Sequence, residues 1–304
     1  SAYDSAGISV AGVGDINRDG YPDVVVGAYG NDRGTLDAGA IYLFRGPLLG
    51  RRSVSTADAI ITGEGPEDWF GYRVGGGGDF NGDGYDDLIV GAPGVSTAGT
   101  DAGAAYVFRG PLAGTRPASL ADAVLVGEAE NDRAGSAIAN AGDVDGDGRD
   151  DLLIGAWGND TGGEDAGAVY LFTGELVGEI PLADAEARIL GAAGDRVGLV
   201  IAGGGDVNRD GHTDVLLGVA GDDEAGVDAG AAWLFQGPIS GDLPCDAGDT
   251  WFVGERAGDQ AGASLGLAGD LDGDGFDDLL IGALGSDAGG EDSGVAYLVR
   301  GQGW

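Results

Sequence analysis

The stretch Asp15-Ile16-Asn17-Arg18-Asp19-Gly20 decides the fold, because the chain repeats its pattern four more times. The later copies begin at Asp79, Asp143, Asp206 and Asp270, at intervals of 64, 64, 63 and 64 residues. Self-similarity at a fixed period is the sequence signature of solenoids, propellers and other repeat architectures. The sequence therefore predicts one domain over residues 1–304, built from five repeats at approximately 1–64, 65–128, 129–192, 193–256 and 257–304.

Each repeat contains segments with the composition of β-strands. The first is rich in glycine and alanine, as in 72–78, and the second is an apolar run such as 87–92. The third is apolar at consecutive positions, as in 168–172, and the fourth is short, as in 59–64. A strand without a polar face has to be covered on both sides. We find no 3.6-residue periodicity of the kind that predicts a helical solenoid.

Four-stranded sheets packed face to face around an axis cover both faces of such strands. The sequence therefore predicts an all-β propeller of five four-stranded blades, with the small first strands nearest the axis. The fifth repeat stops before a fourth strand, so we expect the edge near 296–299 to be unpaired. We also expect the five blades to close into a ring, because an open stack would expose apolar sheet faces.

Composition limits the classes of partner. The chain has 52 acidic residues against 15 basic ones and a net charge of −37, yet 43% of it is hydrophobic, which is enough to bury a core. Nucleic acids and anionic membrane surfaces require clustered basic residues, so neither is an expected partner. No apolar run approaches the roughly 18 residues of a membrane span. Cys245 is the only cysteine, which rules out an intrachain disulfide.

The repeated stretch follows the pattern Asp-x-Asn/Asp-x-Asp-Gly-x-x-Asp, with side-chain oxygens at positions 1, 3, 5 and 9. Hard oxygen ligands at alternate positions around a glycine turn suit Ca²⁺, and carboxylates that converge would repel one another without a cation. Position 7 varies in chemistry, as expected if only its backbone carbonyl coordinates. We predict about five Ca²⁺ ions, one per repeat, bound by Asp15, Asn17, Asp19, Tyr21, Asp23; Asp79, Asn81, Asp83, Tyr85, Asp87; Asp143, Asp145, Asp147, Arg149, Asp151; Asp206, Asn208, Asp210, His212, Asp214; and Asp270, Asp272, Asp274, Phe276, Asp278.

These loops differ from EF-hands, which need a bidentate Glu at position 12. Position 12 is aliphatic in every repeat and belongs to the next strand, as at Val26 and Val90. The ninth-position Asp should therefore close each site, in a loop between strands rather than between helices. The alternative is an Asp- and Gly-rich turn that binds no metal.

With these motifs the chain resembles FG-GAP repeats, the blades of the integrin α-subunit propeller. Phe70-Gly71 together with Gly91-Ala92-Pro93 reproduces the pattern that names the family, and other repeats keep shorter versions such as Ala6-Gly7 with Gly27-Ala28. The resemblance implies Ca²⁺ on one face and ligand docking on the opposite face. The family ring usually has seven blades, only some of which carry metal, so a fragment of a seven-bladed propeller is the alternative architecture.

Two further acids recur at the end of the blades opposite the predicted Ca²⁺ loops. We interpret them as turn residues whose carboxylates accept backbone N–H groups, the alternative being a ring of carboxylates that meets a cationic or metal-bridged partner. The first set is Asp4, Asp68, Asp132, Asp195 and Asp259, and the second is Asp37, Asp101, Asp165, Asp228 and Asp292. Residues that break the repeat symmetry there are better ligand-binding candidates, namely Tyr29, Arg33, Trp69, Trp157 and Asn159.

Catalytic groups are scarce. The only histidine, His212, lies inside a predicted Ca²⁺ loop, and the chain has no lysine, so neither a Ser-His-Asp triad remote from metal nor a Schiff base is expected. We predict no enzyme and no catalytic residue. The leading hypothesis is an extracellular or cell-surface adhesion module that binds a protein or glycan, with structural Ca²⁺. The alternatives are an assembly component that pairs through its open blade edge, and a Ca²⁺-dependent carbohydrate-active enzyme that uses paired carboxylates.

Overall fold

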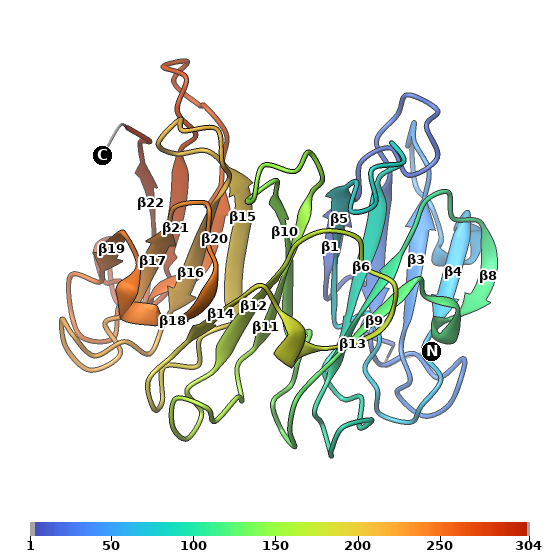
Figure 1. Ribbon diagram of the computed structural model, residues 1–304, viewed down its shortest axis with the longest axis horizontal. Coiled ribbons are helices and arrows are strands. Elements are labelled where there is room, and N and C mark those ends of the chain that lie inside the picture. Colours follow the sequence, from blue (N-terminus) through green and yellow to red (C-terminus); the bar gives the residue numbers. More distant parts are fainter. Residues whose placement is uncertain (1–3, 303–304) are drawn as a thin grey trace. The chain divides into compact units, whose positions relative to one another are not determined.

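The computed structural model describes residues 4–302, which form strands, four short 3-10 turns and loops (Figure 1). The chain divides into two compact units. One runs to Asn140 and includes Gly174–Ala185; the other consists of Ala141–Thr173 and the chain from Glu186 onward. The strands form five small sheets, which confirms the all-β architecture of propeller blades. A single domain and a closed ring stay predictions.

In the first unit, the first and second repeats each form an antiparallel meander. The strands of the first repeat are β1 (Val10–Gly12), β2 (Val24–Ala28), β3 (Ala40–Phe44) and β4 (Ala59–Thr62). Those of the second are β5 (Arg73–Gly78), β6 (Asp87–Ala92), β7 (Ala104–Phe108) and β9 (Ala123–Val126). The third strands are buried along nearly their whole length, as a strand covered on both faces should be.

The remaining repeats follow the same order of strands. The third has β10 (Ala137–Gly142), β11 (Asp151–Ala156), β12 (Ala168–Phe172) and β14 (Ala187–Leu190). The fourth has β15 (Val200–Gly205), β16 (Asp214–Val219), β17 (Ala231–Phe235) and β19 (Thr250–Val253). The fifth has β20 (Ala261–Leu267), β21 (Leu279–Ala283) and β22 (Val295–Val299), and its sheet is three-stranded within the described residues, as predicted.

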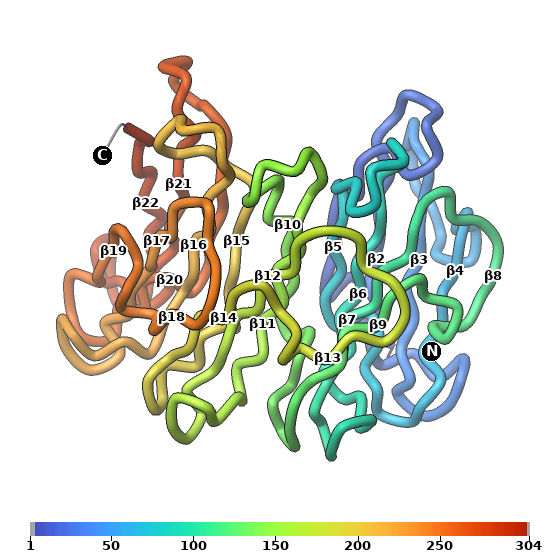
Figure 2. Tube along the Cα trace, viewed as in Figure 1, coloured from blue at the N-terminus to red at the C-terminus, as the bar shows by residue number. Residues whose placement is uncertain are grey.

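Three sheets contain an additional strand that the sequence analysis did not predict. The connection between the third and fourth strands of a repeat pairs in parallel with the fourth strand of the preceding repeat. These strands are β8 (Gly114–Pro117) on β4, β13 (Gly178–Pro181) on β9 and β18 (Gly241–Pro244) on β14. Figure 2 shows the excursion from Gly174 to Ala185 that forms β13. The shared signal in the sequence is Gly-x-x-Pro before a short turn.

This connection also belongs to the hydrophobic core of the first unit. Leu112 and Ala118, on either side of β8, are buried in one cluster with Ile61 of β4 and Phe108 of β7. A segment that looks like a surface loop in the sequence therefore fastens one blade to the next.

We expect Leu112→Ala to lower the free energy of unfolding by about 2–5 kcal/mol, because it leaves a cavity in this cluster. Leu120→Ala in the following turn is the matched control, since Leu120 is 60% exposed and its truncation should change stability by less than about 0.5 kcal/mol. Urea unfolding of both variants measures the difference. Equal effects would show that the connection is not part of the core.

The glycines of the two halves of the repeat motif meet across successive blades. A Cβ on Gly27 would lie 2.2 Å from the carbonyl oxygen of Gly71, and one on Gly91 would lie 2.0 Å from that of Gly135. Gly155 meets Gly198, and Gly218 meets Gly262, in the same way. The second-strand glycine of one repeat and the glycine at the start of, or just before, the first strand of the next are therefore required by close backbone approach between neighbouring blades.

Candidate metal centres

The loops between the first and second strands turn their side-chain oxygens inward. In the first loop, Asp15 accepts the N–H groups of Asp19 (2.9 Å) and Gly20 (2.7 Å), and Asp19 accepts that of Tyr21 (3.0 Å). The bond from the glycine N–H at position 6 to the Asp at position 1 occurs in all five loops, at 2.6–3.0 Å. The repeated pattern thus folds five loops in one conformation.

The ninth-position Asp is buried in every repeat and fastens its loop to the sheet. One oxygen accepts the N–H of position 2, as Asp87 does from Phe80 (3.2 Å). In four repeats the other oxygen accepts the N–H of the glycine that follows the third strand, as Asp87 does from Gly110 (3.0 Å). This anchoring role was not part of the sequence prediction, which assigned these residues only to metal.

The third loop is the strongest candidate for a cation site. Asp143, Asp145 and Asp151 each bring a carboxylate oxygen within 4.8 Å of the others. Asp151 Oδ1 is buried and accepts no hydrogen bond, which leaves a costly unsatisfied charge. A Ca²⁺ ion would fit this donor set, because it prefers several hard oxygen ligands.

A second cluster lies in the fifth loop, where oxygens of Asp270, Asp272 and Asp274 are also within 4.8 Å of one another. The third and fifth loops are the ones with Asp rather than Asn at position 3. The structure thus brings together carboxylates in two of the five predicted sites. The complete ligand sets and the number of five ions stay predictions.

Burial raises the pKa of four ninth-position carboxyls, those of Asp23, Asp87, Asp151 and Asp214. The pKa of Asp87 and that of Asp151 rise to about 7, and that of Asp214 to about 6, chiefly because burial disfavours the charged form. The acids at other positions of the same loops add repulsion, as Asp83 and Asp79 do for Asp87. These loops therefore concentrate negative charge that either a proton or a cation can relieve.

We expect Asp147→Ala to lower the number of bound Ca²⁺ ions by one and to leave the other sites unchanged, because each loop supplies its own ligands. Native mass spectrometry counts the ions directly. Asp160→Ala, at an exposed position outside the loops, is the control and should retain the full number. An unchanged count for Asp147→Ala would remove position 5 from the ligand set.

At the opposite end of the blades, the first set of recurring acids behaves as predicted. Each of four members accepts the N–H of the residue three positions earlier, at 2.7–3.0 Å: Asp68, Asp132, Asp195 and Asp259. Asp4 instead accepts from the side-chain amide of Asn31 (3.0 Å). The carboxylates of Asp68, Asp132, Asp195 and Asp259 therefore close turns between the fourth strand of one repeat and the first strand of the next.

The second set has a different role. Its members share a left-handed backbone conformation, with φ between 48° and 53°. Two of them pair with arginines of the next repeat: Asp101 with Arg133 (3.1 Å) and Asp165 with Arg196 (3.2 Å). The interpretation as backbone N–H acceptors therefore does not describe these two carboxylates.

Two of the predicted binding candidates complete these ion pairs. The guanidinium of Arg133 stacks on Trp69, 5.5 Å from the ring centroid, and that of Arg196 stacks on Trp157 at 5.7 Å. Each group combines a cation, an aromatic face and a carboxylate. The sequence did not reveal these groups, because their members come from successive repeats.

The other predicted ligand-binding candidates, Asn159, Tyr29 and Arg33, do not belong to these two groups. Asn159 is buried; it donates to Tyr170 Oη (3.2 Å) and accepts from the N–H of Thr161 (2.9 Å), so it supports the loop. Tyr29 packs edge-on against Tyr72, and Arg33 lies over the ring of Tyr42.

The groups considered for nucleophilic catalysis are constrained by their surroundings. Cys245 is buried, and burial raises the pKa of its thiol, which keeps it protonated. His212 lies with Nδ1 at 3.2 Å from the carbonyl oxygen of Val144. No helix among residues 4–302 is long and apolar enough to cross a membrane.

Comparison with known proteins agrees with this geometry. The FG-GAP repeat model matches residues 6–44, 70–108, 134–172 and 261–299, that is, four of the five repeats from the first strand through the third. The chain is 35% identical to integrin alpha-5 of Xenopus laevis over 237 residues, covering 73% of this chain and 21% of that protein. It is 34% identical to integrin alpha-V of Gallus gallus over 235 residues, covering 74% and 21%.

A relative of another kind is the phosphatidylinositol-glycan-specific phospholipase D of Bos taurus, 36% identical over 165 residues, which are 52% of this chain and 19% of that protein. The matches thus span about a fifth of the length of these relatives. The repeated strands, the glycine contacts between successive blades and the matched segments agree: the chain belongs to the FG-GAP repeat family.

Proposed function

We propose that this chain is a Ca²⁺-stabilised, extracellular binding module that recognises a protein or glycan ligand and does not catalyse a reaction. The Ca²⁺ part of the proposal rests on the third loop. Three carboxylates converge there, and one of their oxygens is buried without a hydrogen-bond partner. The same loop conformation recurs in every repeat, which supports similar sites elsewhere in the chain. The family relationship to integrin alpha chains supports the binding role.

The two arginine–tryptophan–aspartate groups are the best candidates for ligand contact. Both lie at the end of the blades opposite the metal loops, because successive antiparallel strands return the chain to alternate ends. The side chains of Arg196 and Asp165 are 54% and 43% exposed, so they are open to a ligand. An aromatic face beside a cation and a carboxylate suits a glycan ring or an amphipathic protein surface.

A binding assay with matched variants tests this proposal. The Ca²⁺-loaded chain is measured against immobilised neutral and cationic polysaccharides and a panel of extracellular proteins. A specific ligand should lose at least about tenfold in affinity with Arg196→Ala and Trp157→Ala, the range expected for contacts that hold an interface together. Arg209→Ala, in a metal loop at the other end, is the control.

Non-specific attraction has to be separated from recognition, because a chain with a net charge of −37 will attract any polycation. Such attraction should disappear at high ionic strength, whereas a specific site should persist. If no ligand responds to the Arg196 and Trp157 variants, these groups do not form the binding site. Release of reducing sugars from an acidic polysaccharide would instead favour the enzymatic alternative.

A further inference from the structure

Position 8 of the repeated loop directly precedes the ninth-position Asp but is not among the predicted ligands. In the fifth loop, residues 270–278, this residue is Asp277. Its carboxylate accepts the backbone N–H of Asp206, which is position 1 of the fourth loop, at 3.0 Å. The N–H of Asp277 donates in turn to the carbonyl oxygen of Asp206 at 3.2 Å. Two hydrogen bonds therefore hold the end of one loop against the start of the preceding loop.

The first and second loops have the same connection. Asp86, at position 8 of the second loop, accepts the backbone N–H of Asp15 at 2.5 Å. A hydrogen bond to a carboxylate is roughly twice as strong as one between neutral groups. Both bonds are also partly buried, which limits competition from water. The connection thus occurs once in each of the two units.

The arginine at position 4 adds a second contact in the same two pairs of loops. Arg18 of the first loop lies over the ring of Tyr85, 4.9 Å from its centroid, and donates to the carbonyl oxygen of Asp83 at 3.4 Å. Arg209 of the fourth loop lies over the ring of Phe276 of the fifth loop at 5.9 Å. In each pair, the earlier loop reaches into the later one, and the later loop holds the main chain of the earlier one.

The third and fourth loops are joined differently. Position 8 of the fourth loop is Thr213, and position 4 of the third loop is Gly146. The hydroxyl of Thr213 donates to the carbonyl oxygen of Ala141 (2.6 Å), and its N–H donates to that of Asp143 (3.3 Å). This pair therefore has neither the carboxylate at position 8 nor the arginine at position 4.

The residue at position 1 organises its own loop. The carboxylate of Asp206 accepts the N–H of Gly211 at 3.0 Å, and Asp277 fixes the main chain from which that carboxylate projects. The next residue, Asp278, accepts the N–H of Leu271 at 3.0 Å within the fifth loop. An ion that orders the fifth loop would therefore also order the start of the fourth.

We propose that Asp277 and Asp86 are positioning residues that couple Ca²⁺ binding between neighbouring loops, which presupposes the Ca²⁺ binding proposed above. The fourth and fifth loops form one cooperative pair, and the first and second loops form the other. Neither carboxylate is a ligand in this proposal, because each acts through position 1 of the preceding loop. Coupling is reciprocal, so an ion in either loop of a pair raises the affinity of the other loop.

Charge alone predicts the opposite effect. Two cations in neighbouring loops repel each other, so an occupied fifth loop should weaken Ca²⁺ binding by the fourth. Coupling through Asp277 should instead strengthen it. The sign of the interaction between the two loops therefore distinguishes positioning from simple electrostatics.

The test measures backbone hydrogen exchange of the whole chain in chelator-buffered solutions of increasing free Ca²⁺. Peptides that cover 206–214 or 270–278 give the Ca²⁺ concentration at which each loop is half protected. In the unmodified chain, both loops should become protected together, over a narrower range of Ca²⁺ than a single site requires. Asp274→Ala, which removes a carboxylate of the cluster in the fifth loop, should raise the midpoint of the fourth loop at least about fivefold.

Substitutions of Asp277 locate the coupling. Asp277→Ala should raise the midpoint of the fourth loop by a similar factor. It should also abolish the further effect of Asp274→Ala, because the coupling is then already lost. Asp277→Asn keeps an oxygen that can accept the N–H of Asp206 and should retain most of the coupling. An effect of charge alone would be lost equally in both variants.

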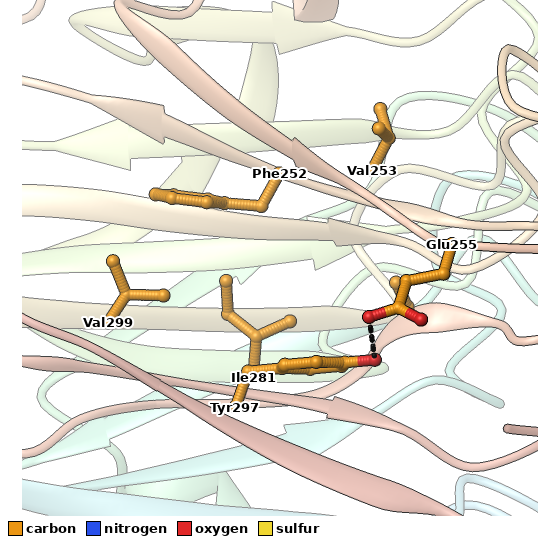
Figure 3. A pocket seen from close by; sticks show the side chains of 7 residues that line it. Phe252, Val253, Glu255, Ile281, Tyr297 and Val299 are labelled. Atoms are coloured by element: carbon orange, nitrogen blue, oxygen red, sulfur yellow. Dashed lines mark hydrogen bonds between the residues drawn. The ribbon is translucent and has the colours of Figure 1, made fainter. Parts of the chain in front are cut away.

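A contact between the same two sheets outside the loops provides the control. Tyr297 of β22 donates its hydroxyl to Glu255, which follows β19, at 3.3 Å across a cavity of about 290 Å³ (Figure 3). Tyr297→Phe removes this bond and should leave the midpoints of the fourth and fifth loops unchanged. A shift as large as that of Asp277→Ala would assign the effect to general packing between the sheets and overturn the proposal.

Two further results would contradict the coupling. One is a midpoint of the fourth loop that is unchanged or lower in Asp274→Ala while Ca²⁺ still protects both loops of the unmodified chain. The other is an equal effect of Asp277→Asn and Asp277→Ala, which would make charge the cause. If Ca²⁺ protects neither loop of the unmodified chain, the proposed Ca²⁺ binding fails as well, so the two failures are distinguishable.

Discussion

Removal of Ca²⁺ should lower the melting temperature of the chain by more than any single substitution proposed here. A ligand that binds only the folded state stabilises it by about 2.7 kcal/mol per site at a hundredfold excess over Kd. In a domain of about 150–250 residues, a change of about 1 kcal/mol in the free energy of unfolding shifts the melting temperature by about 2–4 °C. Several sites emptied together should therefore lower the melting temperature by well over about 10 °C.

The measurement is a thermal unfolding scan with Ca²⁺, with excess chelator, and with chelator followed by restored Ca²⁺. Each scan is repeated at low salt and at about 1 M NaCl, where the Debye length falls to about 3 Å. The comparison at high salt is needed because any cation that screens the 52 acidic residues would reduce their repulsion and stabilise the folded chain. A chelator effect that vanishes at high salt would mean that the loops attract cations without forming sites.

The strands and the loop positions could be predicted because each is encoded locally. Apolar runs such as Asp87–Ala92 became strands, and the Asp and Gly pattern produced the same turn five times. Alignment of the repeats also predicted the three-stranded fifth sheet that is found within residues 4–302. In each case the decisive contacts lie within one repeat.

What the sequence did not reveal depends on contacts between repeats. The strand Gly114–Pro117 has no apolar alternation of its own and forms because Ala59–Thr62 presents an edge to it. Likewise, Arg133 meets Asp101 and Trp69 only after the fourth-to-first connection has been placed. The Gly-x-x-Pro signal was visible, but its meaning required the neighbouring blade.

The ninth-position Asp shows a third limit of prediction from sequence, because one residue can have two roles. Its spacing from position 1 predicted a metal ligand, and that assignment stays a prediction. The structure adds that Asp87 joins the loop 79–87 to the residues after β7 through hydrogen bonds from Phe80 and Gly110. Sequence spacing alone does not separate an anchor from a ligand, because both roles require a carboxylate.

The stability of the Ca²⁺-free chain should fall as pH rises from about 4 to about 7. Burial raises the pKa of Asp87 and of Asp151 to about 7 from the ordinary value of 3.8 for an aspartate. Between these values the folded state holds protons that the unfolded state has already released. The free energy of unfolding therefore decreases through this window, and above about pH 7 these groups add no further change.

Ca²⁺ should reverse this trend, because it binds the deprotonated carboxylates and competes with protons for them. Ca²⁺ should thus raise the melting temperature far more at pH 7.5 than at pH 5. A tenfold change in proton affinity corresponds to about 1.4 kcal/mol. In the Ca²⁺-free chain, Asp87 and Asp151 together should therefore lower the free energy of unfolding by several kcal/mol as pH rises to about 7.

Substitutions can distinguish the effect of the buried carboxyls on the pH dependence of stability from the effect of the chain's overall negative charge. Asp87→Asn removes one titrating group and should flatten the pH dependence of the Ca²⁺-free protein, although it also weakens one anchoring hydrogen bond and lowers stability at every pH. Glu130→Gln, at an exposed position, should leave the slope as it is in the unmodified chain. If both variants show the same slope, surface repulsion rather than burial of the ninth-position Asp governs the pH response, and the elevated pKa values have no measurable consequence for folding.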